Sequence, residues 1–128
     1  MDVGCGGGLL CEPMSKLGAN VTGIDIVEKN IKTASAHSEA NNLPIKYMVN
    51  TVEDLAEKKT KYDVILNMEV IEHVSDVSLF IKSCSDLLSE NGIMNSRKFL
   101  ILDSGEIDEF SCLSCSKKPV TFAINFDP

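Results

Sequence analysis

Apolar and polar positions divide the first 94 residues into short apolar runs separated by amphipathic segments. The pattern of buried strands occurs at 1–3, 21–26, 45–49, 62–68 and from 93 onward. Helical spacing or helix end signals occur at 9–17, 28–41, 52–58 and 76–89. Strand and helix therefore alternate. This order predicts an α/β fold: a Rossmann-like, doubly wound, mostly parallel sheet with helices on both faces.

The pattern changes near residue 95, which divides the chain into a core at 1–94 and a divergent C-terminal tail at 95–128. In the tail, residues 97–102 and 120–126 have the character of strands and predict an edge pair. The segment 111–116 between them is rich in serine and cysteine, and it predicts a loop.

Three glycines, Gly4, Gly6 and Gly8, lie where the first strand turns into the first helix. Glycine permits positive φ angles and a close approach of the backbone to a ligand. Ligands of such sheets bind beyond the carboxyl ends of the strands, so we expect this loop to face a ligand. A dinucleotide fingerprint would place its last glycine at position 9, which is Leu9 here, and this weakly disfavours a nicotinamide cofactor.

Acidic residues accompany the glycine loop. A carboxylate at Asp2 would disfavour a pyrophosphate and attract a cationic ligand group such as the ammonium of a methionine moiety, or it simply hydrogen-bonds the turn. Asp25 ends the second strand, roughly 20 residues further on, where a carboxylate accepts both hydroxyls of a ribose. Glu53 follows the third strand and either borders an adenine or lies at the surface. Together these positions predict a nucleoside site.

The strand at 62–68 runs directly into Glu69, Glu72 and His73. Their i, i+3, i+4 spacing places them on one face if the segment is helical. Two carboxylates and an imidazole suit Mg²⁺, Mn²⁺ or Zn²⁺, and His73 also suits a general base near neutral pH. From composition alone, solvated glutamates and a helix-capping histidine account for the pattern equally well.

Composition restricts the class of protein. The chain of 128 residues allows one domain, and its net charge of −7 argues against nucleic acid as a partner. Neither a run of eighteen apolar residues nor a signal-peptide pattern occurs. An odd count of five cysteines then indicates reduced thiols in the cytoplasm.

Four segments together resemble the ubiquinone biosynthesis O-methyltransferases: DVGCGGG at 2–8, VTGIDI at 21–26, NTVED at 50–54 and YDVILNMEVIEHV at 62–74. The resemblance covers residues 1–94 and implies S-adenosylmethionine as cofactor, contacted by Gly4, Asp25 and Met68. It further implies a magnesium site at Glu69, Glu72 and His73.

The same resemblance implies that the acceptor is a polyprenyl catechol or demethylubiquinol, which would bring peripheral contact with the inner membrane (on the matrix side in mitochondria). Family members carry a helical region before the first strand, whereas Met1 stands directly before Asp2 here, and the sequence from Asn95 onward departs from the family. We therefore expect an incomplete class I methyltransferase fold with reduced activity. A non-catalytic methyltransferase remnant and an NAD-binding oxidoreductase domain remain as alternatives.

Overall fold

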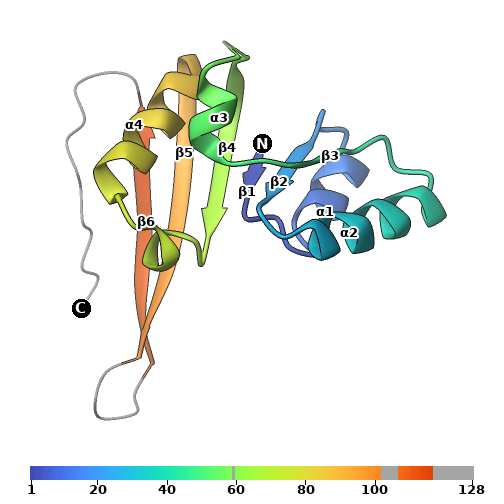
Figure 1. Ribbon diagram of the computed structural model, residues 1–128, viewed down its shortest axis with the longest axis horizontal. Coiled ribbons are helices and arrows are strands. Elements are labelled where there is room, and N and C mark those ends of the chain that lie inside the picture. The colour runs from blue at the N-terminus through green and yellow to red at the C-terminus, as the bar shows by residue number, and fades with distance from the viewer. Residues whose placement is uncertain (59, 102–106, 117–128) are drawn as a thin grey trace.

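The computed structural model describes residues 1–58, 60–101 and 107–116, which form one six-stranded sheet with helices against it (Figure 1). The strands are β1 Asp2–Val3, β2 Thr22–Asp25, β3 Lys46–Val49, β4 Tyr62–Met68, β5 Leu88–Ile101 and β6 Ile107–Ser116. Their order is β3-β2-β1-β4-β5-β6, with the first five parallel and β6 antiparallel to β5. The predicted mostly parallel α/β sheet is confirmed.

Helices follow the parallel strands and bury two separate apolar clusters. They are α1 Cys11–Lys16, α2 Glu28–Ala40, α3 Val52–Ala56, the 3₁₀ helix η1 Ile71–His73 and α4 Val77–Leu87. Side chains of α1 and α2 pack with Cys5 and Val21, whereas those of α3 and α4 pack with Val3 and Ile65. Successive residues of a strand point to opposite faces, so β1 presents its two side chains to different layers. None of the described helices is long and apolar enough to cross a bilayer.

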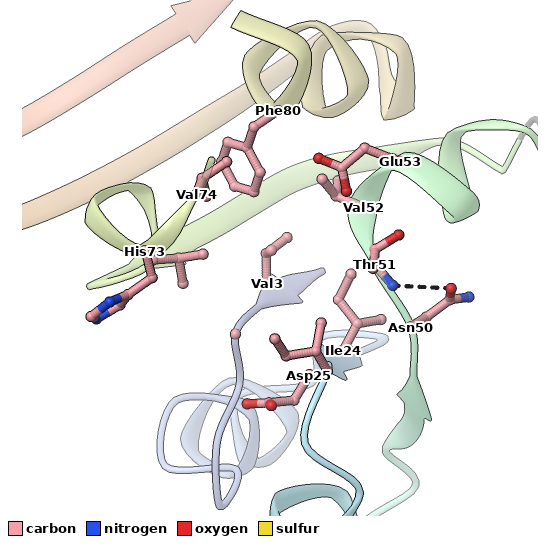
Figure 2. Close-up of a pocket in the computed structure, with 13 residues that line it drawn as sticks. Val3, Ile24, Asp25, Asn50, Thr51, Val52, Glu53, His73, Val74 and Phe80 are labelled. Carbon is pink, nitrogen blue, oxygen red and sulfur yellow. Dashed lines mark hydrogen bonds between the residues drawn. The ribbon is translucent and has the colours of Figure 1, made fainter. Parts of the chain in front are cut away.

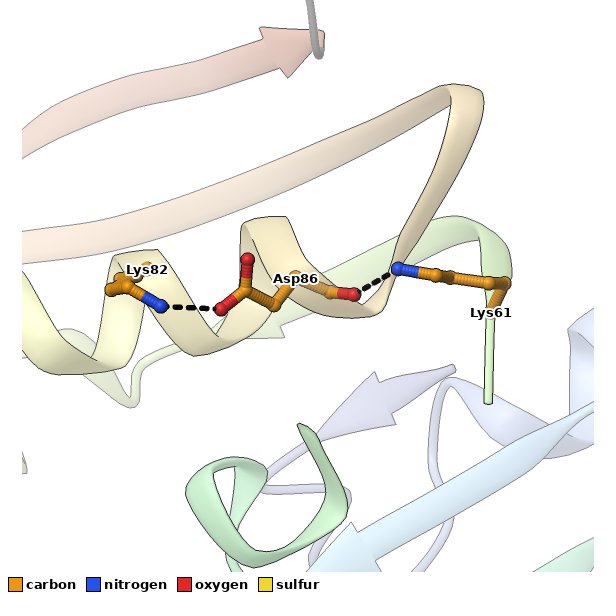
Figure 3. A network of polar contacts seen from close by, with 3 residues as sticks. All are labelled: Lys61, Lys82 and Asp86. Carbon is orange, nitrogen blue, oxygen red and sulfur yellow. Dashed lines mark hydrogen bonds and ion pairs between the residues drawn. The ribbon is translucent and has the colours of Figure 1, made fainter. Parts of the chain in front are cut away.

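Polar contacts fix α4 at both ends. The Asp76 carboxylate accepts from the Leu79 backbone N–H at 2.9 Å and caps the first turn. Near the other end the Lys61 ammonium, just before β4, donates to the Asp86 carbonyl oxygen, and Lys82 pairs with the Asp86 carboxylate at 2.6 Å (Figure 3). The first and third contacts stabilise the helix itself, and the Lys61 contact joins its last turn to the start of β4. The first turns of α4 reach the carboxyl edge of the sheet, where Phe80 lines the cavity described below.

The C-terminal part differs from the sequence expectation. Residues 111–116, predicted as a loop, belong to β6 and pair with β5. Strand β5 begins at Leu88 rather than near 93; its register against β4 jumps from Tyr62–Leu88 to Val64–Ile93, which leaves an irregular bulge between them. The predicted strand at 120–126 lies outside the described residues, and the division of the chain near 95 stays a prediction.

Candidate functional site

A cavity of about 190 Å³ opens at the carboxyl edge of the sheet. It lies where the strand order reverses, because β1 pairs with β2 on one side and with β4 on the other. Open parallel sheets bind their ligands at this point. Its lining comes from the ends of β1 and β2, the segment after β3 with the start of α3, the segment after β4 with η1, and α4 (Figure 2). The residues are Val3, Gly4, Ile24, Asp25, Ile26, Asn50, Thr51, Val52, Glu53, Val70, His73, Val74 and Phe80. The floor is apolar and the rim carries the polar groups.

The glycine loop has the left-handed backbone that its composition predicts. Gly4, Gly6 and Gly8 have φ angles of 70°, 52° and 86°. At Gly8 a Cβ would also lie 2.3 Å from the hydroxyl of Tyr47, and at Gly4 it would lie 2.3 Å from a methyl of Val70. Gly4 lines the cavity, whereas Gly6 and Gly8 shape the loop behind it. A side chain at Gly4 or Gly8 would therefore displace the packing around the loop.

The Asp25 carboxylate ties the glycine loop to the start of α2. Its Oδ2 accepts from the Gly6 backbone N–H at 2.9 Å and from the Asn30 amide at 3.2 Å, and its Oδ1 accepts from the Val27 backbone N–H at 2.8 Å. A carboxylate offers about four acceptor positions, so three bonds leave roughly one free. Asp25 lines the cavity at the predicted place, and it also holds the loop.

Asp2 points to the other face of the sheet. It is 4 % exposed, does not line the cavity, and accepts from the Cys11 thiol at 3.4 Å. Burial raises the pKa of this carboxyl to about 6, against the lowering effect of the thiol hydrogen bond. The Asp2 carboxylate therefore contacts α1 on the far side of the sheet from the cavity, and its predicted contact with a cationic ligand group stays a prediction.

The ends of β2 and β3 supply further rim residues, and the sequence patterns did not single out Ile26 among them. Ile26 follows Asp25 directly and is 72 % exposed, an unusual position for an isoleucine at the edge of a cavity. Across from it, the Asn50 side chain accepts from the Thr51 N–H at 3.0 Å, and Thr51 caps α3. Glu53, in the first turn of α3, lies on the rim as predicted (Figure 2). The only signal for Ile26 in the sequence is an apolar residue directly after the strand-end acid Asp25.

The segment after β4 is not the predicted helical face. Glu69 is exposed with a φ of 57°, and only the three residues of η1 are helical, in the tighter 3₁₀ form. One oxygen of Glu72 is buried without a hydrogen-bond partner, while the exposed His73 lines the cavity with its imidazole pointing away from Val3 (Figure 2). Met68 does not line the cavity. Among the described residues, no three His, Cys, Asp or Glu side chains converge to hold a metal ion. The predicted magnesium ligands therefore do not fit an ion as placed.

Comparison with known proteins adds to this geometry. Residues 1–95 match the family model described as "Methyltransferase domain". The chain is 53 % identical over 94 residues to the ubiquinone biosynthesis O-methyltransferase of Bartonella tribocorum and 57 % identical to that of Pelagibacter ubique. These matches cover 73 % of this chain and 38 % and 39 % of the two relatives, so the chain spans less than half the length of the curated relatives it matches.

Solved structures show the same fold at low sequence identity. The PH0226 protein of Pyrococcus horikoshii aligns with a TM-score of 0.71 at 20 % identity, over 76 % of this chain and 44 % of that one. An S-adenosylmethionine-dependent methyltransferase of Clostridium acetobutylicum aligns with a TM-score of 0.70 at 20 % identity, over 77 % and 41 %. Both likenesses support the Rossmann-like assignment of the sheet.

Proposed function

The chain belongs to the methyltransferase domain family, and on that premise we propose that it is the S-adenosylmethionine-binding part of an O-methyltransferase. The observation that supports this most directly is the coincidence of three features at one edge of the sheet. The left-handed glycine loop, the Asp25 carboxylate and the cavity all lie at the reversal point of the strand order. This arrangement suits a nucleoside with a charged tail.

In the proposed complex the ribose hydroxyls bind Asp25, through its remaining acceptor position or by replacing the Asn30 amide. The adenine lies between the exposed Ile26 and the Thr51–Glu53 turn, where apolar contact and backbone polar groups are both available. The methionine moiety then extends along Gly4, which is exposed and lines the cavity. The cavity of about 190 Å³ is smaller than a typical site for a ligand of this size, so part of the cofactor extends beyond it.

The acceptor that we propose is a phenolic hydroxyl of a prenylated catechol or quinol, since the relatives are named for ubiquinone biosynthesis. S-adenosylmethionine supplies a methyl group on a positively charged sulfur. The acceptor oxygen attacks that methyl in line; the O–C bond forms as the S–C bond breaks, and the hydroxyl proton must leave. His73, at the rim beside Val70 and Val74, is the proposed proton acceptor. A prenylated acceptor would also bring the peripheral membrane contact that the resemblance implies.

Magnesium has no role in this scheme, because Glu69, Glu72 and His73 do not converge on an ion position. The ion remains a prediction with a simple test. Turnover that falls in excess chelator and returns with added Mg²⁺ would require the ion and would show that the turn after β4 rearranges around it.

Titration calorimetry with S-adenosylhomocysteine and, separately, with NADH tests the proposed function. We expect saturable binding of the nucleoside product at one site and no binding of NADH. The opposite result would favour the oxidoreductase alternative. If S-adenosylhomocysteine binds but no methyl ether forms from a catechol and S-adenosylmethionine, the non-catalytic remnant becomes the better account.

His73→Gln tests the proposed proton acceptor in the same assay. Loss of a positioned base lowers turnover by about a hundredfold or more, while the affinity for S-adenosylhomocysteine should not change. His37→Gln, an exposed histidine on α2, is the matched control. Equal turnover of the two variants would remove His73 from the chemistry.

A further inference from the structure

The loops after β1 and β4 interlock at the wall of the cavity. These strands are parallel neighbours, with Val3 paired to Asn67, so the two loops that follow them leave the sheet side by side. Gly4 turns away with a φ of 70°, and the place that its Cβ would occupy lies 2.3 Å from the Cγ2 methyl of Val70. Both residues line the cavity. The valine methyl therefore fills the space that the missing side chain leaves open.

Glu69 provides the backbone turn that precedes this contact. Its φ of 57° is left-handed, and among the described non-glycine residues only Asn42 shares that property. Asparagine adopts this conformation readily, whereas glutamate in it costs about 1 kcal/mol or more. Strain of this kind persists where the surroundings fix it, and it gathers at functional sites. Here it lies one residue before the interlock and leaves the Glu69 side chain in solvent.

We propose that Glu69 is a positioning residue that acts through its backbone: its left-handed turn seats Val70 against Gly4 and so joins the cofactor loop to the segment that carries His73. The link to His73 is direct, because its backbone N–H donates to the Val70 carbonyl at 2.9 Å. A shift of Val70 thus moves the cofactor loop and the His73 backbone together. This inference rests on the proposed function, since it concerns the alignment of the two halves of that site.

Three variants of Glu69 separate the backbone from the carboxylate. Glu69→Gln keeps the size and removes the charge, Glu69→Gly keeps the left-handed turn without a side chain, and Glu69→Val strongly disfavours the turn. We expect the glutamine and glycine variants to bind S-adenosylhomocysteine within about threefold of wild type, and the valine variant to bind at least about tenfold more weakly, a loss equal to about 1.4 kcal/mol. Binding is measured well below the melting temperature, so that unfolding does not contribute. Comparable losses in the glutamine and glycine variants would overturn the proposal in favour of a carboxylate role.

A double-mutant cycle tests the interlock even if Glu69→Val fails to fold. Gly4→Ala should lower the melting temperature and weaken S-adenosylhomocysteine binding. Adding Val70→Ala should recover part of both losses, because the methyl at 2.3 Å is gone while the positive φ of residue 4 persists. If Val70→Ala recovers nothing, the two loops are not interlocked. If wild type does not bind the ligand, the proposed function fails, but the melting temperatures still decide whether Val70 and Gly4 are coupled.

Discussion

Replacing Asp25 by alanine perturbs the loop and the ligand site at once. The change leaves the backbone N–H groups of Gly6 and Val27 and the amide of Asn30 without their acceptor. A hydrogen bond to a charged group contributes about 1.5–3 kcal/mol. Because the three donors are only part-buried and water replaces the lost acceptor, we expect a total loss of about 2–4 kcal/mol in the free energy of unfolding rather than the full sum. At roughly 4 °C per kcal/mol for a domain of this size, the melting temperature falls by about 8–16 °C.

The same substitution should weaken the binding of S-adenosylhomocysteine by at least about tenfold, since the proposed hydrogen bonds from the ribose to Asp25 are also charge-assisted. Thermal unfolding followed by circular dichroism gives the first quantity, and titration calorimetry gives the second. Glu28→Ala is the matched control: this carboxylate lies three residues away, and its ion pair with Lys32 is exposed on both sides, so the change should be under about 1 kcal/mol. A melting temperature within about 2 °C of wild type would refute the structural role of Asp25. A large loss of stability with unchanged affinity would place the ribose elsewhere.

Three further substitutions test the residues around the site, each by the free energy of unfolding measured in urea. Gly8→Ala should cost about 2 kcal/mol or more, because residue 8 has a φ of 86° and its Cβ would lie 2.3 Å from the Tyr47 hydroxyl; an unchanged midpoint would contradict this. Asn67→Val should stabilise the fold by about 1–3 kcal/mol, because both polar atoms of the Asn67 side chain are buried without a hydrogen-bond partner. A loss of stability would contradict the absence of a partner for this side chain. The pKa of Asp2 is raised from 3.8 to about 6, so the folded state binds this proton more tightly and stability should fall as the pH rises between those values; Asp2→Asn should flatten that slope, and an identical slope would contradict the assignment.

The sequence predicted the parallel core well because the signals there are local. The run at 62–68 is apolar and bounded by polar residues, and it became β4 with the same ends. The helix at 28–41 became Glu28–Ala40 because its buried Ile31 and Ala34 face one side. The segment 111–116 became a strand against expectation, because its partner is β5. Pairing between strands is a tertiary property, and a serine-rich composition does not reveal it.

The sequence predicted which edge of the sheet carries the candidate site, but it did not predict which side chains point into the cavity. Strand alternation sends Val3 to the cavity and Asp2 to the opposite layer, and this requires knowing where β1 enters the sheet. Asp25 was expected at the site, but its three bonds to the loop and to α2 depend on how those segments fold back. A strand-end acid therefore marks a place at the edge without revealing whether it serves the ligand, the loop or both.

The segment 69–73 shows why residue spacing alone misleads. Glu69, Glu72 and His73 share a face only if residue 69 begins a right-handed helix, and the spacing assumes that condition rather than testing it. With residue 69 left-handed, the helix starts two residues later and the three polar side chains separate, one to solvent, one half-buried and one to the rim. No sequence pattern marks the apolar Val70 between them, yet it makes the contact with Gly4 that joins the two loops. In this turn, the contact between the two loops is therefore made by the residue whose chemistry is least distinctive.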